Sequence, residues 1–388
     1  MYNIKLMNRI SPSGTSQFKP SRYRVGDDTE KPDAIIVRSA SLHDMEIPES
    51  LRAVARAGAG VNNIPVDELS KRGIVVFNTP GANANAVKEL VITALLLSAR
   101  KITDGINWAK TLDGNGENID GLVESGKASF AGPEIAGKKL GVIGLGAIGV
   151  QVANTAHSMG MDVLGYDPYI SVDAAWGLSR SIRKIDSLKT IYEESDFITL
   201  HVPLNSETKE MLNEETFQLM KPSMRILNFS RGGLINEDDL APHLESGRIA
   251  FYVTDFPTQK NLTMKNTICI PHLGASTPES EDNCAATAAR QVIDFLENGI
   301  IKNSVNFPNV ETSKDTKTRV CLMHKNIPSM INLISMVFSK HGLNIEHLTN
   351  KSRKNYAITF VDVDEELPTD VLRELKAIES MISVREIR

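Results

Sequence analysis

Short apolar runs, separated by turn residues and by helical patterns, fill the first part of the chain. Runs rich in β-branched residues predict strands at 2–7, 34–37 and 74–77. Gly73, a typical residue at the end of a helix, predicts a helix at 67–72 before the third strand. Apolar positions three and four residues apart predict a longer, mostly buried helix at 85–98. Because strands alternate with helices, this stretch predicts a parallel sheet. Glycines between positions 114 and 126 then indicate a looser, polar connection.

A second block of the same kind begins at Lys139. Its predicted strands are 140–143, 162–165, 197–200, 225–229, 250–253 and 267–270. Helical patterns lie between most of these strands, for example at 148–159 and 236–245, and a long helix is predicted at 285–296. Six parallel strands with crossover helices predict a doubly wound sheet.

The C-terminal part of the chain has a different order of predicted strands and helices. A polar run at 309–317 indicates a linker. Beyond it, strands are predicted at 319–323, 346–349, 356–362 and 383–387, and helices at 330–340 and 369–378. This βαββαβ order predicts a ferredoxin-like unit.

Length and composition narrow the class of protein. A chain of 388 residues predicts two or three domains, and 41% hydrophobic against 23% charged residues excludes wholesale disorder. The net charge of −5 argues against nucleic acid or anionic lipid as a partner. The three cysteines are odd in number and show no CxxC spacing, which excludes a disulfide framework, argues against a zinc site and favours a reducing, cytoplasmic location. No signal-peptide pattern occurs at the N-terminus, and the longest apolar run, 90–97, is far shorter than the ~20 residues of a membrane span.

The strongest motif is a glycine-rich loop that follows a predicted strand and opens a helix. Its glycines are Gly144, Gly146 and Gly149, and Ala147 and Ile148 lie between the last two. This GxGxxG spacing permits a tight turn, close approach of the backbone to a pyrophosphate, and close packing of helix on strand. The phosphates are then expected at the unpaired N–H groups of the helix N-terminus.

An acidic residue supports a dinucleotide at this loop. Asp167 ends the next predicted strand, where a carboxylate accepts hydrogen bonds from a ribose 2′-hydroxyl and repels a 2′-phosphate. The sequence therefore predicts NAD rather than NADP as the cofactor. The alternative, a glycine-rich turn without a ligand, stays open.

Two further segments, 228–233 and 270–277, also follow strand-like runs. Both are expected at the carboxyl ends of strands, where open α/β sheets bind ligands. Arg231 suits a substrate carboxylate, because its planar guanidinium binds carboxylates through two hydrogen bonds. His272 suits a general base, because an imidazole titrates near the working pH of enzymes. Taken singly, each residue type is more often structural.

In their order along the chain, these pieces resemble the D-isomer-specific 2-hydroxyacid dehydrogenases. The resemblance covers essentially the whole chain and rests on Val37-Arg-Ser39, 57–63, Asn78-Thr-Pro80, the glycine loop, His201-Val-Pro-Leu204, 228–232 and 271–277. It is strongest to the branch that oxidises 3-phosphoglycerate, and the C-terminal unit is similar to the ACT domain that members of that branch carry. The resemblance implies a discontinuous, flavodoxin-like substrate-binding domain (1–84 and 276–308), a Rossmann NAD-binding domain (85–275), a linker (309–317) and an ACT-like regulatory domain (318–388).

The family pattern assigns Arg231 to the substrate carboxylate and His272 to acid/base catalysis. A glutamate between them normally orients the histidine and stabilises its protonated form. Gln259 occupies the matching position here, and a glutamine can hold the imidazole by a hydrogen bond but supplies no negative charge. Three outcomes stay open: reduced activity, substitution by another carboxylate such as Asp255, or a different alignment of this loop.

The resemblance also implies binding residues. His201, Val202, Pro203 and Asp255 are expected along the nicotinamide side of the cofactor, and Thr208 at the pyrophosphate, although His201 is equally well interpreted as a packed strand-end residue. On the substrate side, the implied set is Arg38 at the phosphate, its neighbour Ser39, and Val61, Asn62 and Asn63 at the carboxylate. Ala40 stands where a second arginine is usual.

In the C-terminal unit, the resemblance implies an L-serine effector site at His324, Asn326 and Asn344. Short polar side chains around a helix N-terminus are able to hold an amino acid by its charged groups. Ser329 replaces the glycine that is usual in this turn, so a changed φ or a crowded pocket is expected there. A dimerising unit without an effector is the alternative.

The combined hypothesis is a cytoplasmic enzyme that oxidises a phosphorylated 2-hydroxy acid, 3-phosphoglycerate, to 3-phosphohydroxypyruvate with NAD at the start of serine synthesis. We expect a homo-oligomer, either dimer or tetramer, with no metal and no nucleic-acid or membrane partner. Two alternatives stay open. One is another 2-hydroxyacid dehydrogenase or 2-keto acid reductase of the family, and the other is an NAD- or amino-acid-sensing protein with weakened catalysis.

Overall fold

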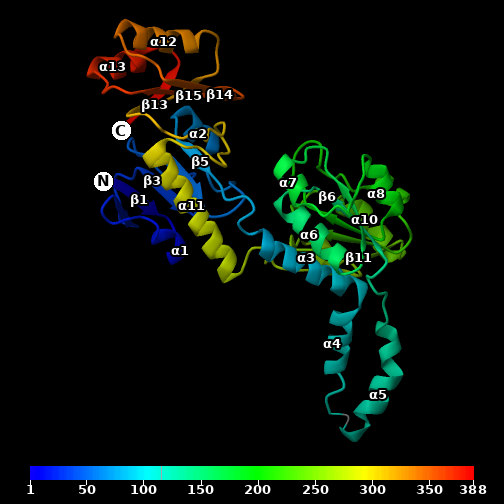
Figure 1. Ribbon diagram of the computed structural model, residues 1–388. Coiled ribbons are helices and arrows are strands. Elements are labelled where there is room, and N and C mark those ends of the chain that lie inside the picture. Colours follow the sequence, from blue (N-terminus) through cyan, green and yellow to red (C-terminus); the bar gives the residue numbers. More distant parts are fainter. Residues whose placement is uncertain (115) are drawn as a thin grey trace. The chain divides into compact units, whose positions relative to one another are not determined.

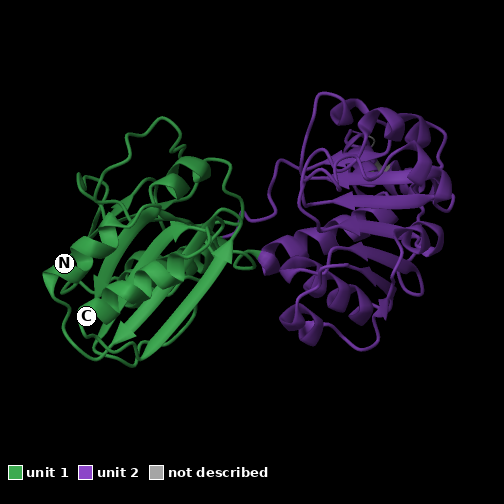
Figure 2. Cartoon of the chain, turned by 90° about the horizontal axis from the view of Figure 1, so that it is seen from above, with its two compact units in different colours: residues 1–83, 278–388 green, residues 84–277 purple. Residues whose placement is uncertain are grey.

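The computed structural model describes residues 1–114 and 116–388, which form two compact units. Unit 1 combines Met1–Asn83 with Pro278–Arg388, and unit 2 is the intervening segment Ala84–Thr277 (Figure 2). Two parallel sheets and one antiparallel sheet make up the molecule, so the predicted α/β fold class with a C-terminal ferredoxin-like unit is confirmed. The finer division into four domains stays a prediction. Within the described residues, no helix is long and apolar enough to cross a membrane.

Unit 2 is built on a seven-stranded parallel sheet. Its strands are β6 (Lys139–Ile143), β7 (Asp162–Tyr166), β8 (Arg183–Lys184), β9 (Phe197–Leu200), β10 (Met224–Asn228), β11 (Ile249–Thr254) and β12 (Thr267–Cys269). They lie in the order β12-β11-β10-β9-β6-β7-β8, which is the doubly wound nucleotide-binding order extended by one strand. The chain reverses direction across the sheet between β6 and β9, and such sheets bind their ligands at this switch point.

Helices cover both faces of this sheet and enclose two apolar cores (Figure 1). The helices are α3 (Ala84–Ala99), α6 (Ala147–Ser158), α7 (Val172–Gly177), α8 (Leu188–Glu194), α9 (Glu214–Leu219) and α10 (Glu237–Glu245), with a 3₁₀ turn η3 (Asn261–Thr263). One core lies under α3 and α6, and the other under α8, α9 and α10. The short β8 was not predicted, because its two charged residues carry no apolar signal.

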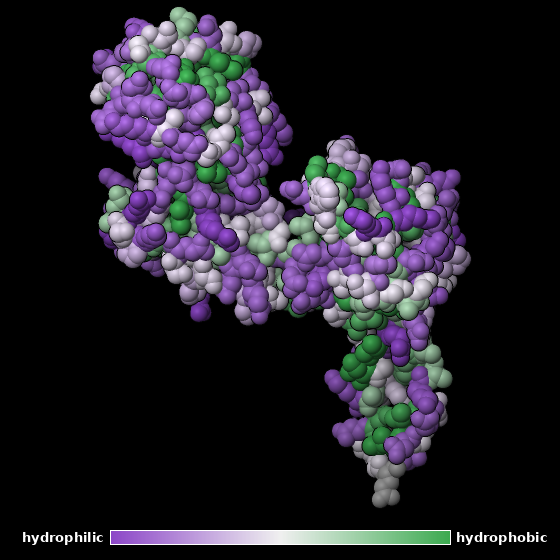
Figure 3. Space-filling view, in the orientation of Figure 1, coloured by the Kyte–Doolittle hydropathy of each residue, from purple (hydrophilic) through white to green (hydrophobic). Residues whose placement is uncertain are grey.

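The expectation of a looser, polar connection at the glycines between positions 114 and 126 is wrong, because the described residues there belong to a helical hairpin. It consists of α4 (Ile102–Lys110), η1 (Gly116–Asn118), α5 (Ile119–Gly126) and η2 (Lys127–Phe130). Apolar residues at helical spacing outweigh the glycines here, and Trp108 packs on Phe130 with ring centroids 5.2 Å apart. No residue of α4 or α5 is buried, and apolar side chains are visible on the hairpin surface (Figure 3).

The N-terminal part of unit 1 is a five-stranded parallel sheet. Its strands are β1 (Tyr2–Leu6), β2 (Tyr23–Gly26), β3 (Ala34–Val37), β4 (Ala53–Arg56) and β5 (Val75–Phe77), and its helices are α1 (Pro12–Thr15), α2 (Val66–Lys71) and α11 (Pro278–Asn298). The order β2-β1-β3-β4-β5 is the flavodoxin-like one. Strands β2 and β4 were not predicted, and the alanines of β4 have low strand propensity. Helix α11 begins seven residues before the predicted start at residue 285, and Pro278 and the acidic first turn are typical of a helix start.

The C-terminal part of unit 1 is a four-stranded antiparallel sheet with two helices. Its strands are β13 (Thr318–Lys325), β14 (His347–Arg353), β15 (Tyr356–Val363) and β16 (Met381–Ile387), and its helices are α12 (Met330–Lys340) and α13 (Thr369–Ala377). Side chains alternate between the two faces of a strand. Val320 and Leu322 therefore pack under α12 and α13, while Cys321 and Met323 join the core around α11 and the first sheet. The central strand β13 is therefore covered on both faces, whereas the edge strand β14 is mostly exposed.

A buried ion pair fastens the C-terminal sheet to the rest of unit 1. The side chain of Arg319 is fully buried and donates two hydrogen bonds of 2.7 Å to the carboxylate of Asp362. Its Nη1 also donates to the carbonyl oxygens of Asn298, at the end of α11, and Thr312. Each charge thus has a partner, which is the condition under which a buried ion pair is tolerated.

A strained residue begins α12. Ser329 has φ +69°, in the left-handed region that favours glycine, and its side chain makes no capping hydrogen bond. We expect Ser329→Gly to raise the free energy of unfolding by about 0.5–1 kcal/mol, because relief of this strain exceeds the extra entropy of an unfolded glycine. Ser329→Ala should leave stability unchanged, since the hydroxyl is unused. Urea unfolding of the three proteins checks this, and a glycine variant no more stable than the serine protein contradicts it.

Candidate active site

The candidate residues of unit 2 follow the carboxyl ends of neighbouring strands. The register pairs the last residues of these strands directly: Ile143 with Leu200, Leu200 with Asn228, Asn228 with Thr254, and Thr254 with Cys269. Because the strands end level with one another, the residues that come next share one edge of the sheet. These are Gly144, His201, Arg231, Asp255 and His272.

The glycine loop has the geometry that its sequence predicts. Gly144 has φ +95°, and a Cβ there would lie 2.4 Å from the carbonyl oxygen of His201. A Cβ on Gly149 would lie 1.9 Å from the carbonyl oxygen of Gly144. At Gly146, by contrast, a Cβ would meet nothing within 4 Å. The backbone is therefore tightly packed on the protein side and open at the residue expected to face a pyrophosphate.

The helix start behind this loop fits a phosphate. Gly146 is the N-cap residue of α6, and no side chain there accepts a hydrogen bond from the N–H groups of the first turn. Among the described residues, no acceptor pairs with the N–H groups of Ala147, Ile148 and Gly149. Three free donors at the positive end of a helix dipole form an anion site.

Asp167 is hydrogen-bonded to the backbone of the glycine loop. It directly follows β7, and its Oδ2 accepts a hydrogen bond of 2.8 Å from the N–H of Leu145, inside the glycine loop. Its Oδ1 accepts from the N–H of Tyr169. The carboxylate is thereby fixed beside the loop, at the position where a ribose hydroxyl would be bound.

His201 is held at the end of β9. Its Nε2 lies 3.0 Å from the hydroxyl of Thr199, while Nδ1 is buried without a partner among the described residues. Burial lowers the pKa of His201 to about 4, so the ring is neutral at physiological pH. An orphaned ring nitrogen beside the glycine loop is consistent with a ligand that completes its hydrogen bonding.

The carboxylate of Asp255 interacts electrostatically with both candidate catalytic residues, His272 and Arg231. Its side chain is buried, and its Oδ1 lacks a partner among the described residues. Burial raises the pKa of Asp255, while the nearby charges of His272 and Arg231 act in the opposite direction. His272 itself has φ +45°, and its ring packs against Phe256 with centroids 5.0 Å apart. A strained, exposed histidine beside a buried carboxylate is typical of a functional site.

Gln259 is exposed, and within the described residues no hydrogen bond joins it to His272. Its role beside His272 stays a prediction. Val202 and Thr208, two other residues predicted to bind the cofactor, make hydrogen bonds within the protein. The carbonyl oxygen of Val202 accepts a hydrogen bond from the hydroxyl of Ser230, which joins the loops after β9 and β10. The hydroxyl of Thr208 donates to the carbonyl of Pro203 at 2.6 Å and accepts from the N–H of Asn205.

Unit 1 holds the predicted substrate residues in two adjoining loops. Asn63 donates to the carbonyl of Ala40 at 2.8 Å, and its buried Oδ1 has no partner in the described residues. The N–H groups of Val61 and Asn62 likewise find no acceptor among these residues. Free donors and an orphaned amide oxygen suit a bound carboxylate or hydroxyl group.

Two contacts in these loops could not be foreseen from the motifs. Asn8 Oδ1 accepts hydrogen bonds from three successive N–H groups, those of Arg38, Ser39 and Ala40. The guanidinium of Arg38 forms an ion pair of 2.7 Å with Glu281, and both side chains are about two-fifths exposed. Neither partner adjoins Arg38 in sequence, so no local pattern signals them.

The predicted effector residues are engaged internally. His324 is buried, its Nδ1 lies 2.9 Å from the carbonyl oxygen of Lys325, and its Nε2 lies 2.9 Å from the hydroxyl of Thr359. Burial lowers the pKa of His324. Asn326 donates to the carbonyl of Lys354, and Asn344 to the carboxylate of Glu346. An effector site here stays a prediction, and it requires His324 to exchange one of these partners.

The lowered pKa of His201 leads to a prediction about pH. Its pKa is lower in the folded protein than its ordinary value of 6.5, so unfolded chains bind the proton first. The stability contributed by neutral His201 is complete above pH ~6.5 and is lost as the pH falls towards ~4, by up to about 3 kcal/mol. We expect His201→Gln to flatten the pH dependence of the unfolding free energy over this range. His157→Gln, in α6, is the control, and equal slopes for both variants contradict the prediction.

Comparison with known proteins agrees with this geometry. Residues 92–274 match the NAD-binding domain of the D-isomer specific 2-hydroxyacid dehydrogenases. The D-3-phosphoglycerate dehydrogenase of Escherichia coli (strain K12) is 31% identical over 350 residues, which cover 87% of this chain and 82% of that protein. The crystal structure of NAD+-bound 3-phosphoglycerate dehydrogenase from Entamoeba histolytica superposes with a TM-score of 0.61 at 27% identity and covers 79% of this chain and 98% of that one.

A longer relative shows how far the likeness extends. The D-3-phosphoglycerate dehydrogenase of Methanocaldococcus jannaschii is 36% identical over 291 residues, which are 73% of this chain and 53% of that protein. The chain thus spans about half the length of this relative. The match to the E. coli protein, which includes most of both chains, carries the assignment. This chain belongs to the D-isomer specific 2-hydroxyacid dehydrogenases and contains their NAD-binding domain.

Proposed function

We propose that the chain is an NAD-dependent dehydrogenase that oxidises 3-phosphoglycerate to 3-phosphohydroxypyruvate. The observation that carries the proposal is the grouping of Arg231 and His272 around the buried Asp255, at the sheet edge that also bears the glycine loop. The names of relatives at 31% and 36% identity support the choice of substrate. A cytoplasmic homo-oligomer is part of the same proposal.

The residues at the glycine loop fit NAD. The free N–H groups of Ala147 to Gly149 would hold the pyrophosphate, and Asp167 the adenosine ribose. Asp167 would also disfavour a 2′-phosphate by charge repulsion, so NAD is preferred to NADP. When bound, NAD supplies the acceptor for the hydride that leaves C2 of the substrate.

The chain's own residues would then move the proton. Arg231, exposed at the turn after β10, binds the substrate carboxylate and so fixes the orientation of C2. Neutral His272 accepts the hydroxyl proton as the hydride departs. Asp255 lies close enough to sense the charge of His272, and it is therefore our candidate for the negative charge that Gln259 does not supply.

The decisive test combines turnover with a substitution at the carboxylate anchor. We expect 3-phosphoglycerate to be oxidised with NAD far faster than with NADP. Arg231→Lys keeps the charge but loses the two-pronged hydrogen bond, so kcat/KM should fall at least a hundredfold, on the order of 3 kcal/mol. The affinity for NADH, measured by fluorescence titration, should barely change.

Other outcomes identify the alternatives. Turnover of unphosphorylated 2-hydroxy acids but not of 3-phosphoglycerate would indicate a sister dehydrogenase. NADH binding without turnover of any 2-hydroxy acid would indicate a sensor. Loss of NADH binding in Arg231→Lys would make Arg231 a structural residue of unit 2.

The ion pair between Arg38 and Glu281 leads to a prediction about the substrate phosphate. Glu281 Oε1 lies 2.7 Å from Arg38 Nη2. It therefore competes with the substrate phosphate, which the family pattern assigns to the guanidinium of Arg38. Removing this competing charge with Glu281→Gln should lower KM for 3-phosphoglycerate about two- to fivefold, the effect of a half-exposed ion pair worth up to about 1 kcal/mol. KM for D-glycerate, which lacks the phosphate, should stay constant. A higher KM for 3-phosphoglycerate would mean that Glu281 orients Arg38 instead.

A further inference from the structure

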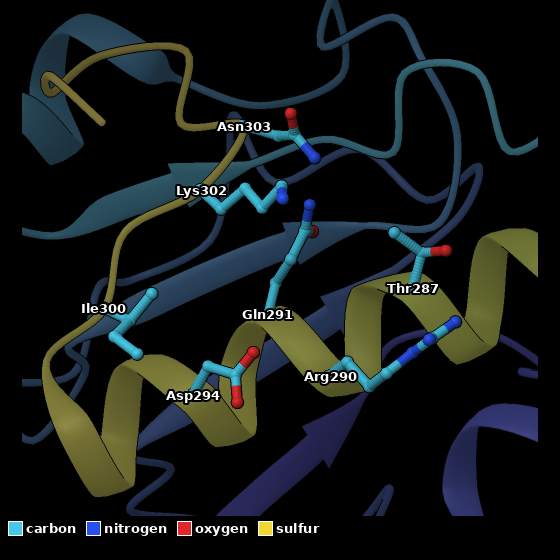
Figure 4. A pocket seen from close by; sticks show the side chains of 7 residues that line it. All are labelled: Thr287, Arg290, Gln291, Asp294, Ile300, Lys302 and Asn303. Atoms are coloured by element: carbon cyan, nitrogen blue, oxygen red, sulfur yellow. The ribbon is translucent and has the colours of Figure 1, made fainter. Parts of the chain in front are cut away.

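A pocket of about 310 Å³ lies in unit 1, between α11 and the segment that follows it (Figure 4). Helix α11 contributes Thr287, Arg290, Gln291 and Asp294, which share one helix face because they are spaced by three and four residues. The segment after α11 contributes Ile300, Lys302 and Asn303. This volume is at the small end of the range for ligand pockets.

Gln291, between the two walls, has an unsatisfied hydrogen-bond acceptor. The residue is only 6% exposed, and its Nε2 donates to the carbonyl of Asn78 at 3.1 Å. Its Oε1 is buried and has no partner in the described part of the chain. Figure 4 shows this side chain rising from α11 into the pocket, between Lys302 and Thr287. A buried amide oxygen without a donor indicates a ligand that carries an N–H or O–H group.

Charges of both signs flank Gln291 along α11. Within the described residues, neither the guanidinium of Arg290 nor the carboxylate of Asp294 has an ion-pair partner within 4.0 Å. Burial raises the pKa of Asp294, while Arg290 and Lys302 act against this rise, so both cations are close enough to sense the carboxylate. Lys302 is bound to Glu311 at 3.2 Å, in an exposed pair that a ligand can exchange at little cost.

We propose that this pocket binds a small α-amino acid in its zwitterionic form. The ammonium group would donate to Asp294 and to Gln291 Oε1, and the carboxylate would accept from Arg290, where a guanidinium binds carboxylates through paired hydrogen bonds. Ile300 supplies an apolar wall for the side chain. An anion alone would leave Asp294 and Gln291 unmatched, and a cation alone would leave Arg290 unmatched. The site is distinct from His324, Asn326 and Asn344, and it does not depend on the proposed reaction.

The test is calorimetric titration of the full chain with each standard L-α-amino acid. We expect at least one to bind, and its analogues lacking either the amino or the carboxyl group to bind at least tenfold more weakly. Arg290→Gln and Asp294→Asn should each raise the dissociation constant about tenfold or more, the effect of one charged hydrogen bond. Arg100→Gln, the same change at an exposed site in unit 2, is the matched control.

Three results would overturn the proposal. The first is that no standard amino acid binds. The second is that binding survives in both pocket variants but is lost in His324→Ala, which would assign it to the C-terminal unit. The third is that the analogue without the amino group binds as well as the amino acid, which would make the pocket a simple anion site. If a variant fails to fold, hydrogen exchange of the unsubstituted chain replaces it. We expect the amino acid to slow the exchange of backbone amides in 287–303, and unchanged exchange there contradicts the proposal.

Discussion

The register of the parallel sheet in unit 2 is the constraint on which its candidate site depends. Leu200, Asn228, Thr254 and Cys269 pair in succession, so four strands end at the same level and their loops meet at one edge. A slip of one residue in any of these strands would turn its side chains to the opposite face. The loops that carry Arg231 and His272, which lie in separate segments of the sequence, are thus brought to one sheet edge by backbone hydrogen bonds between the strands.

The parts of the site that could be predicted from sequence are those tied to a strand end. The glycine loop, Asp167, Arg231 and His272 each follow an apolar run, so a local pattern and the rule for parallel sheets place them together. Asp255 shows where this reasoning stops. The sequence identified it as a cofactor-side residue and as the nearest alternative to Gln259, whereas its burial and its proximity to both His272 and Arg231 come from the packed fold.

Long-range pairing explains most of what the sequence did not reveal. Arg38 meets Glu281 only because α11 returns to the first sheet after the whole of unit 2, and no local spacing encodes that contact. His324 shows a different limit of sequence reasoning. Its spacing from Asn344 predicts an effector site, which stays a prediction, but no spacing reveals that β13 is buried on both faces and that both imidazole nitrogens have internal partners. A polar side chain in a doubly covered strand is satisfied by its neighbours before any ligand arrives.

The division of unit 1 into two separated segments has a consequence for biosynthesis. The first sheet relies on α11 and on the inner face of the C-terminal sheet to cover Phe77 and its neighbours, and the Tyr2 hydroxyl is bonded to Leu296 at the far end of α11. During translation these covering elements leave the ribosome after unit 2, which is continuous and complete as soon as residue 277 has emerged. The N-terminal sheet therefore emerges before unit 2 but is covered only after it. It stays exposed to chaperones and to other nascent chains throughout the synthesis of unit 2.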